Sequence, residues 1–252
     1  MTLGIKSAAL GLALALLFVQ AATADPRLDE KVYDPYVHNH IFEIETRAAS
    51  ESGGPLAGAV AYIGELEYGV SDHLSLSLVN KVAGGAGEPT RLRGVGVEAV
   101  DYLGQIPGLG IDVGLYGEYM AGLGGDDSGL EAKLLLAKQA GPVEALLNLI
   151  VERPIHVPGQ EFATYGYAGA VNWRAGGNLK LGIQAFGDLG DDHGGFSRPQ
   201  VAYVGPAIFW EGRPRRSPVE VELGLSWLKA FGADRHEGDR QVRVTLEFER
   251  RF

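Results

Sequence analysis

The closing segment of the chain, 241–252, alternates between apolar and polar side chains. Val242, Val244, Leu246 and Phe248 share one parity, and Phe252 returns to it, while Gln, Arg, Thr and Glu fill the other parity. Side chains of a β-strand point to opposite faces with a period of two, so this segment predicts a strand with one apolar face and one charged face. Both a soluble sandwich and a membrane barrel can bury such a face.

The two ends of the sequence favour the membrane barrel. An aromatic residue such as Phe252, directly after such a strand, is typical of bacterial outer-membrane barrels, although Arg250 departs from the apolar parity. At the other end, Lys6 precedes a short apolar run, 8–19, and Ala-Thr-Ala follows at 22–24. That run is shorter than the roughly 20 residues that span a bilayer. We therefore expect a cleaved signal peptide over 1–24 and a polar periplasmic lead-in over 25–35.

The remainder, 36–252, divides into about twelve segments of strand length, most of them alternating. These are approximately 36–47, 57–69, 74–81, 91–103, 109–121, 130–136, 143–151, 164–174, 179–184, 198–211, 219–227 and 241–252. The signal of one transmembrane strand is weak, so the prediction depends on the number and spacing of the segments. The even count, and connections that alternate between short and long, predict an all-β, up-and-down antiparallel transmembrane barrel of twelve strands, with ten as the second choice.

One part of this interpretation has a helical alternative. The runs before and after Gly141-Pro142 are rich in Leu and Ala and can be read locally as helices. Their charges lack helical spacing, and a Gly-Pro turn between two alternating runs favours a hairpin. At Gly205-Pro206 we expect a bulge or a distortion, because proline cannot donate to the strand ladder.

Composition excludes several classes of protein. The sequence has no Cys, so disulfides and thiolate sites are absent. Its formal net charge of −10 would repel phosphates, so we expect no nucleic-acid partner. The partners we expect are outer-membrane lipid, the barrel assembly machinery through the strand that ends at Phe252, and a small solute. The expected location is the outer membrane of a Gram-negative bacterium.

The segment 64–72 reads Gly-Glu-Leu-Glu-Tyr-Gly-Val-Ser-Asp. It resembles a hairpin of a bacterial outer-membrane transporter family labelled for the MetA pathway of phenol degradation. Features similar to that family's fall at 94–102, 131–133, 147–152 and Gly205-Pro206. The resemblance implies a barrel through which small compounds pass, hydrophobic ones among them. The family has no defined activity that can be carried over to particular residues.

Charged side chains on the inward parity are the candidate functional residues. A barrel of about twelve strands is wider than one that side chains fill, so a wet and charged interior is expected. The candidates for lining the lumen are Glu43, Glu45, Glu65, Glu67, Glu118, Glu131, Lys133, Glu144, Glu152, Lys180, Glu220, Glu222, Arg243 and Glu247. Two interpretations remain open: salt bridges that hold the barrel in shape, or an acidic constriction that favours cations.

No other group of residues predicts a catalytic site, a metal site or a cofactor. His38 and His40 share a face, but no third ligand can be paired with them. The acidic segments 126–127 and 191–193 have the composition of solvated loops. We expect a non-enzymatic barrel that transports or passively admits small solutes. The alternative is a structural or surface-interaction barrel with a blocked lumen, and a hydrolase built on the rim loops is a distant third.

Overall fold

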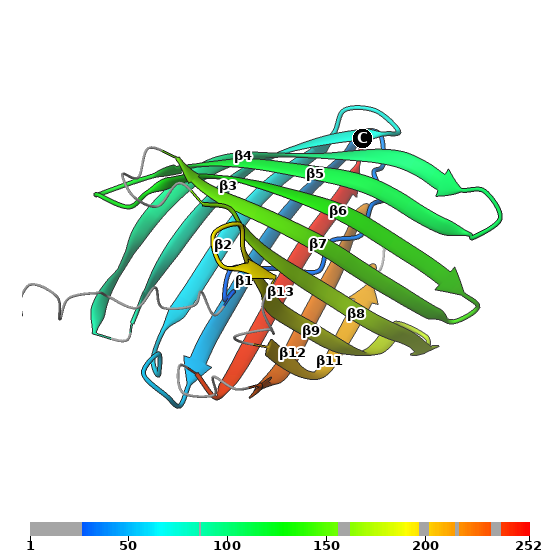
Figure 1. Cartoon of the computed structure of the whole chain (residues 1–252). Coiled ribbons are helices and arrows are strands. Elements are labelled where there is room, and N and C mark those ends of the chain that lie inside the picture. The colour runs from blue at the N-terminus through cyan, green and yellow to red at the C-terminus, as the bar shows by residue number, and fades with distance from the viewer. Residues whose placement is uncertain (1–26, 86, 156–161, 197–201, 215–216, 233–237) are drawn as a thin grey trace, which may run out of the picture.

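The computed structural model describes residues 27–85, 87–155, 162–196, 202–214, 217–232 and 238–252. They form one antiparallel sheet of thirteen strands that closes on itself (Figure 1). One of these, β10 (Gly195–Phe196), is a two-residue strand that pairs only with the end of β9, which leaves twelve strands in the barrel wall. Within the described residues, no helix is long and apolar enough to cross a membrane.

The barrel strands follow one another around the wall in chain order. Their bounds are β1 (Ile41–Ser52), β2 (Val60–Gly69), β3 (Leu74–Gly85), β4 (Glu88–Ile106), β5 (Ile111–Gly122), β6 (Ser128–Ala140), β7 (Val143–Ile155), β8 (Thr164–Gly176), β9 (Leu179–Asp191), β11 (Ala202–Gly212), β12 (Val219–Phe231) and β13 (Arg240–Arg251).

The barrel closes between its first and last strands. β1 pairs with β13 over its whole length, from Ile41 opposite Arg251 to Ser52 opposite Arg240. The predicted twelve-stranded up-and-down barrel is thus confirmed, and the two runs around Gly141-Pro142 form the hairpin β6–β7. We call the end where β1 begins and β13 finishes the C-terminal end, and the opposite end, where β1 finishes and β2 begins, the loop end.

Three details differ from, or add to, the sequence expectation. β4 has 19 residues, and its pairing with β3 and β5 includes register shifts. β3 ends at Gly85 and β4 begins at Glu88, so the connection between these strands is short although it lies at the loop end. At Gly205 and Pro206 the pairing with β12 is interrupted, because proline has no amide hydrogen, yet the register on either side is unchanged.

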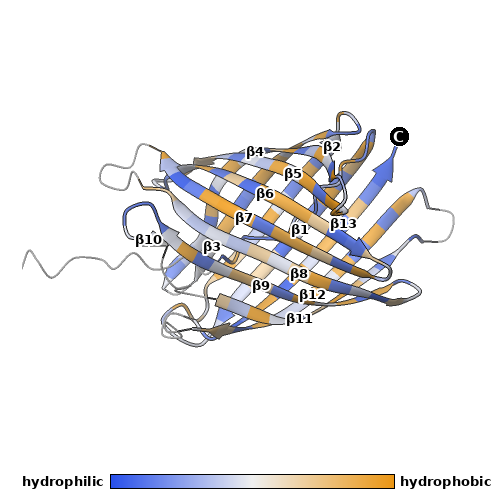
Figure 2. Cartoon of the chain, turned by 45° about the vertical axis from the view of Figure 1, so that its right-hand side comes forward, coloured by the Kyte–Doolittle hydropathy of each residue, from blue (hydrophilic) through white to orange (hydrophobic). Residues whose placement is uncertain are grey.

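Apolar side chains cover the outer face of the barrel. Leu76, Leu147 and Leu223 are 49%, 40% and 47% exposed, and each lies on the parity that the alternation assigns to lipid. The large side chains Tyr68 and Trp173, which are also exposed, lie toward the strand ends. Figure 2 shows hydrophobic and hydrophilic positions alternating along the strands. An apolar band with aromatic residues near its edges is the outer surface of a transmembrane barrel.

The segment before β1, which we call the strap (residues 27–40), lies inside the barrel (Figure 1). Arg27 contacts Glu152 and Asp188, which are near the loop end of β7 and β9. His40 donates its backbone amide to Gly69 at the C-terminal end. The strap therefore runs through the lumen from one end toward the other. The sequence predicts a periplasmic lead-in over 25–35; the structure describes 27–35 of it and places these residues in the lumen.

Apolar side chains of the strap bury themselves on apolar patches of the inner wall. Leu28 packs on Ala49 and Ala61, while Val32 packs on a cluster that contains Ile150 and Phe186. Further along, Tyr33 and Val37 pack against Val100, Tyr116 and Leu135. Burial of one such side chain stabilises the docked state by about 1.5–3 kcal/mol. The strap is thus anchored by packing as well as by charge.

Candidate functional site: a glutamate-lined lumen crossed by a strap

All fourteen charged residues proposed from the sequence as lumen-lining face the inside of the barrel. Toward the C-terminal end the wall carries Glu43, Glu45, Glu67, Glu144, Lys180, Glu220, Glu222 and Glu247. Arg243 lines the same cavity but lies nearer the loop end, opposite Ala49. Toward the loop end it carries Glu118, Glu131, Lys133 and Glu152. Glu65 also points inward, because its carboxylate contacts Lys31 of the strap. Inward parity accounts for these positions, since alternate side chains of every barrel strand face the lumen.

The strap lies between two cavities of the lumen. The cavity toward the C-terminal end has a volume of about 350 Å³, and the cavity toward the loop end has about 340 Å³. Glu30, Tyr33 and Arg47 line both cavities, so the strap and Arg47 contribute to the wall between them. A third cavity, of about 710 Å³, opens at the C-terminal mouth and is lined by Glu220, Glu249 and Arg251 among others.

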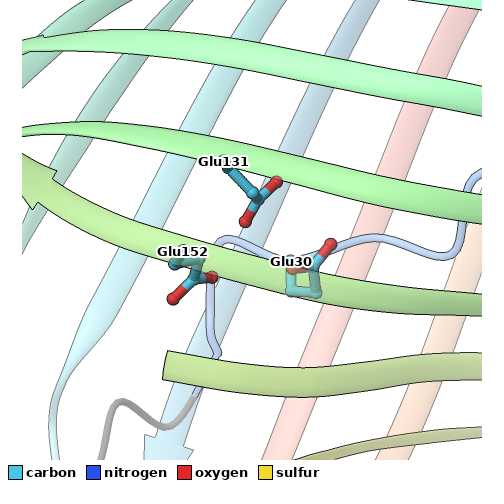
Figure 3. A group of neighbouring side chains, drawn as sticks. All are labelled: Glu30, Glu131 and Glu152. Atoms are coloured by element: carbon cyan, nitrogen blue, oxygen red, sulfur yellow. The ribbon is translucent and has the colours of Figure 1, made fainter. Parts of the chain in front are cut away.

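Salt bridges join the strap to the wall near the loop end. The Arg27 guanidinium is 3.0 Å from a carboxylate oxygen of Glu152 and 2.7 Å from one of Asp188. Lys133, which is almost fully buried, pairs with Glu30 of the strap and lies 2.9 Å from Glu131. Figure 3 shows Glu30 beside Glu131 of β6 and Glu152 of β7. These three carboxylates approach closely because Lys133 and Arg27 lie among them.

A second set of salt bridges holds the middle of the strap. Lys31 Nζ is 3.0 Å from Glu45 and 3.4 Å from Glu65, and it lies 4.4 Å from the centre of the Tyr33 ring. Arg47 approaches the same two carboxylates at 2.5 and 3.0 Å. Burial would lower the pKa of Lys31, but Glu45 and Glu65 raise it well above its usual value. The ammonium therefore stays charged in the lumen.

One side-chain amide holds the backbone of the strap. Asn148 is fully buried on β7; its Oδ1 accepts from the Tyr33 amide at 2.7 Å, and its Nδ2 donates to the Tyr33 carbonyl at 2.8 Å. On the opposite wall, Arg243 donates to the carbonyl oxygens of Glu30 and Arg27 at 2.6 and 2.5 Å. The strap is not a strand of the sheet, so these side chains supply hydrogen bonds that its buried backbone groups need.

Strand register arranges many of the wall's glutamates in one row. Each member is the direct cross-strand partner of the next, and β12, β13 and β1 to β7 each contribute one. In order, the row is Glu220, Glu249, Glu43, Glu67, Ser77, Glu98, Glu118, Glu131 and Glu152. Eight of these nine positions are Glu. The row begins at the C-terminal end of β12 and finishes near the loop end of β7, because the strands of a closed barrel are staggered. It winds around the lumen between the two mouths.

A second, shorter row runs beside the first. Glu211, Glu222, Glu247, Glu45 and Glu65 are successive cross-strand partners on β11, β12, β13, β1 and β2. Four adjacent strands, β12, β13, β1 and β2, therefore each contribute one glutamate to each of the two rows. Like charges on neighbouring strands are destabilising unless cations or protons compensate them. Here Lys31 and Arg47 form salt bridges with Glu45 and Glu65. Lys180 forms one with Glu222, and Arg213 forms one with Glu220.

The histidines and the acidic loops have ordinary local roles. His40 Nδ1 is 3.0 Å from the Tyr68 hydroxyl, and His38 lines the C-terminal mouth. Asp126 pairs with Arg91 and Arg93, whereas Asp191 accepts from the backbone amides of the turn that follows it. Among the described residues, no hydrogen bond or ion pair joins Asp126 to Asp191.

Sequence reasoning missed the strap residues and the amide that binds them. Arg27, Asp29, Glu30 and Lys31 are charged, and their composition alone reads as a solvated leader. The one signal that could have found Asn148 is its place on the inward parity of an otherwise apolar segment. A lone amide there calls for a hydrogen-bond partner within the lumen.

A closed twelve-stranded barrel with an apolar outside and a charged, partly open inside has the architecture of an outer-membrane porin. Two solved porins have a similar fold. The KdgM porin, in complex with disordered oligogalacturonate, superposes with a TM-score of 0.52 at 9% identity and covers 83% of this chain and 99% of its own. The NanC porin superposes with a TM-score of 0.54 at 8% identity and covers 83% and 100%. At such identities the likeness concerns the fold alone. No family model matches the sequence, and no curated protein matches it either.

Proposed function

We propose that this barrel sits in the outer membrane of a Gram-negative bacterium and passively admits small solutes through its lumen. The observation that carries the proposal is a closed barrel whose charged interior opens into cavities on both sides of the strap. The strap narrows the path, so the solute must be small or the strap must shift. The residues of the lumen act by binding and repelling the solute during passage, and no catalytic step is required.

The proposed surroundings follow from the outer face. Lipid contacts the apolar band that contains Leu76, Leu147 and Leu223. The strand β13 closes the barrel against β1, and we propose that the assembly machinery recognises this strand through its apolar parity and Phe252. The short turns at the C-terminal end would face the periplasm, and the loop end would face outward.

Two observations bear on the class of solute. The resemblance to the phenol-degradation transporters suggests small compounds, hydrophobic ones among them. A lumen with eight glutamates in one row argues against an acidic sugar chain such as the oligogalacturonate found with the KdgM porin, because like charges repel.

A second candidate function is a barrel whose lumen stays blocked, with the outer loops serving as a contact surface. The docked strap favours this alternative, because its backbone and side chains are bonded to the wall at Asn148, Arg243 and Glu152. The two candidates differ in whether anything passes the strap.

Conductance of the purified full chain in planar bilayers separates them. We expect stepwise openings in KCl, and we expect the open fraction to rise when Asn148→Ala removes the amide that holds Tyr33. Asn172→Ala is the matched control, because Asn172 also points into the lumen but bonds Glu144 instead of the strap. Absence of conductance in the wild type and in Asn148→Ala, with both correctly folded, would reject solute passage and favour the blocked barrel.

A further inference from the structure

The inner wall has more acidic groups than its basic groups can neutralise. On the four strands with paired glutamates, Glu43, Glu67, Glu247 and Glu249 form no salt bridge with any described residue. Glu43, Glu45 and Glu247 nevertheless have carboxylate oxygens within 4.8 Å of one another. These side chains line the cavity of about 350 Å³ toward the C-terminal end. Carboxylates this close need protons or cations between them.

One oxygen of Glu65, the cross-strand neighbour of Glu45, is a buried acceptor that is also unused. The side chain of Glu65 is 1% exposed, and its Oε2 accepts from Lys31 and Arg47. Its Oε1 has no hydrogen-bond partner among the described residues. A buried carboxylate oxygen without a donor is costly, so a further cation or N–H donor at this place would be stabilising.

The strap shows which chemistry these carboxylates bind. Lys31 supplies a primary ammonium to Glu45 and Glu65, and Arg27 supplies a guanidinium to Glu152 at the far end of the long row. The strap is a single segment that carries organic cations at intervals, and it pairs with the glutamates from inside the barrel. A free molecule with the same features would compete for the same partners.

We propose that the glutamate rows bind linear organic polycations of the polyamine class, and that the strap is a tethered competitor for this site. The inference rests on the proposed function, in which the lumen is the solute path. Neighbouring strands are about 4.8 Å apart, so successive glutamates of a row present charge at that interval. Ammonium groups separated by a few methylene units can follow such a row, whereas a single metal ion would use only one cluster.

The test measures binding independently of conductance. Radiolabelled spermine is equilibrated by dialysis against the detergent-purified full chain at low salt. Binding to the wild type is expected, and Glu43→Gln with Glu247→Gln is expected to weaken it about tenfold, because two carboxylates that can pair with an ammonium group become neutral amides. A charge-matched control, Glu88→Gln with Asp101→Asn, removes two exposed carboxylates elsewhere and should leave the affinity unchanged.

The competitor role is tested with Lys31→Gln, which frees Glu45 and Glu65 from the strap ammonium. Spermine affinity should rise about threefold or more, since the ligand no longer displaces a bound cation. Heat-modifiable migration on a gel verifies that each variant is folded.

Several results would overturn the inference. No spermine binding to the folded wild type would do so, as would equal affinity in the Glu43/Glu247 variant and its control. Calcium binding at the rows without spermine binding would show that they hold metal ions instead. Weaker spermine binding in Lys31→Gln would mean that the strap builds the site rather than competing for it. Binding without conductance would reject solute passage alone, and conductance without binding would reject the polycation site alone.

Discussion

Replacing Asn148 by Ala should release the strap from the wall. Asn148 is fully buried and makes two hydrogen bonds to the backbone of Tyr33, at 2.7 and 2.8 Å. The substitution leaves the Tyr33 amide and carbonyl without these partners, and each unsatisfied buried group costs about 1–3 kcal/mol. Lumen water recovers part of that loss, so we expect the docked strap to be destabilised by about 2–4 kcal/mol. At 1.4 kcal/mol for each factor of ten, the released population should rise about 30- to 700-fold.

The absence of cysteine makes the release measurable. A single thiol introduced by Val32→Cys lies on the strap, against the cluster that contains Ile150 and Phe186. Its reaction with a maleimide should accelerate in the Asn148→Ala background by a factor within the predicted range. Adding Asn172→Ala to the Val32→Cys protein should leave the maleimide reaction rate unchanged, because Asn172 bonds Glu144 and not the strap. Equal rates with and without Asn148 would show that this amide does not hold the strap.

Three further predictions concern the wall and the strap ends. Leu246→Arg places a charge on the lipid face and should lower the free energy of unfolding by about 2–4 kcal/mol, measured by urea unfolding from vesicles. Thr245→Arg, beside the lumen cavity, should lower it only slightly. Equal losses of stability in the two variants would contradict the face assignment. Burial would raise the pKa of Asp29, but Lys81 lowers it from 3.8 to about 2. The stability that this pair adds is therefore present above about pH 4 and is lost as the pH falls toward 2. The difference in unfolding free energy between wild type and Asp29→Asn should shrink over that window, and a difference that stayed constant would refute the role of this pair. Gly69→Ala should lower the thermal midpoint by disturbing the junction of strap and barrel, because an added Cβ would overlap the backbone oxygen of His38. A midpoint equal to that of the wild type would argue against this close approach.

The alternation along the strands was enough to predict the barrel and its two faces. In β1, for example, Ile44 and Thr46 lie on one parity and Glu43 and Glu45 on the other, and the structure keeps that division. This part is predictable because the period of two comes from the backbone geometry of each strand and needs no distant partner. The count of twelve followed from turn signals such as Gly141-Pro142, which are equally local.

Only the tertiary structure decided which glutamates face each other and what occupies the lumen. That Glu118 lies beside both Glu98 and Glu131 depends on hydrogen-bond register and on the stagger of the closed barrel. The strap is still less predictable, because it is held by partners far away in the sequence, such as Asp188 for Arg27. Alternation determines the direction in which a side chain points. The distance between two side chains is determined by the closure of the barrel, which no single segment encodes.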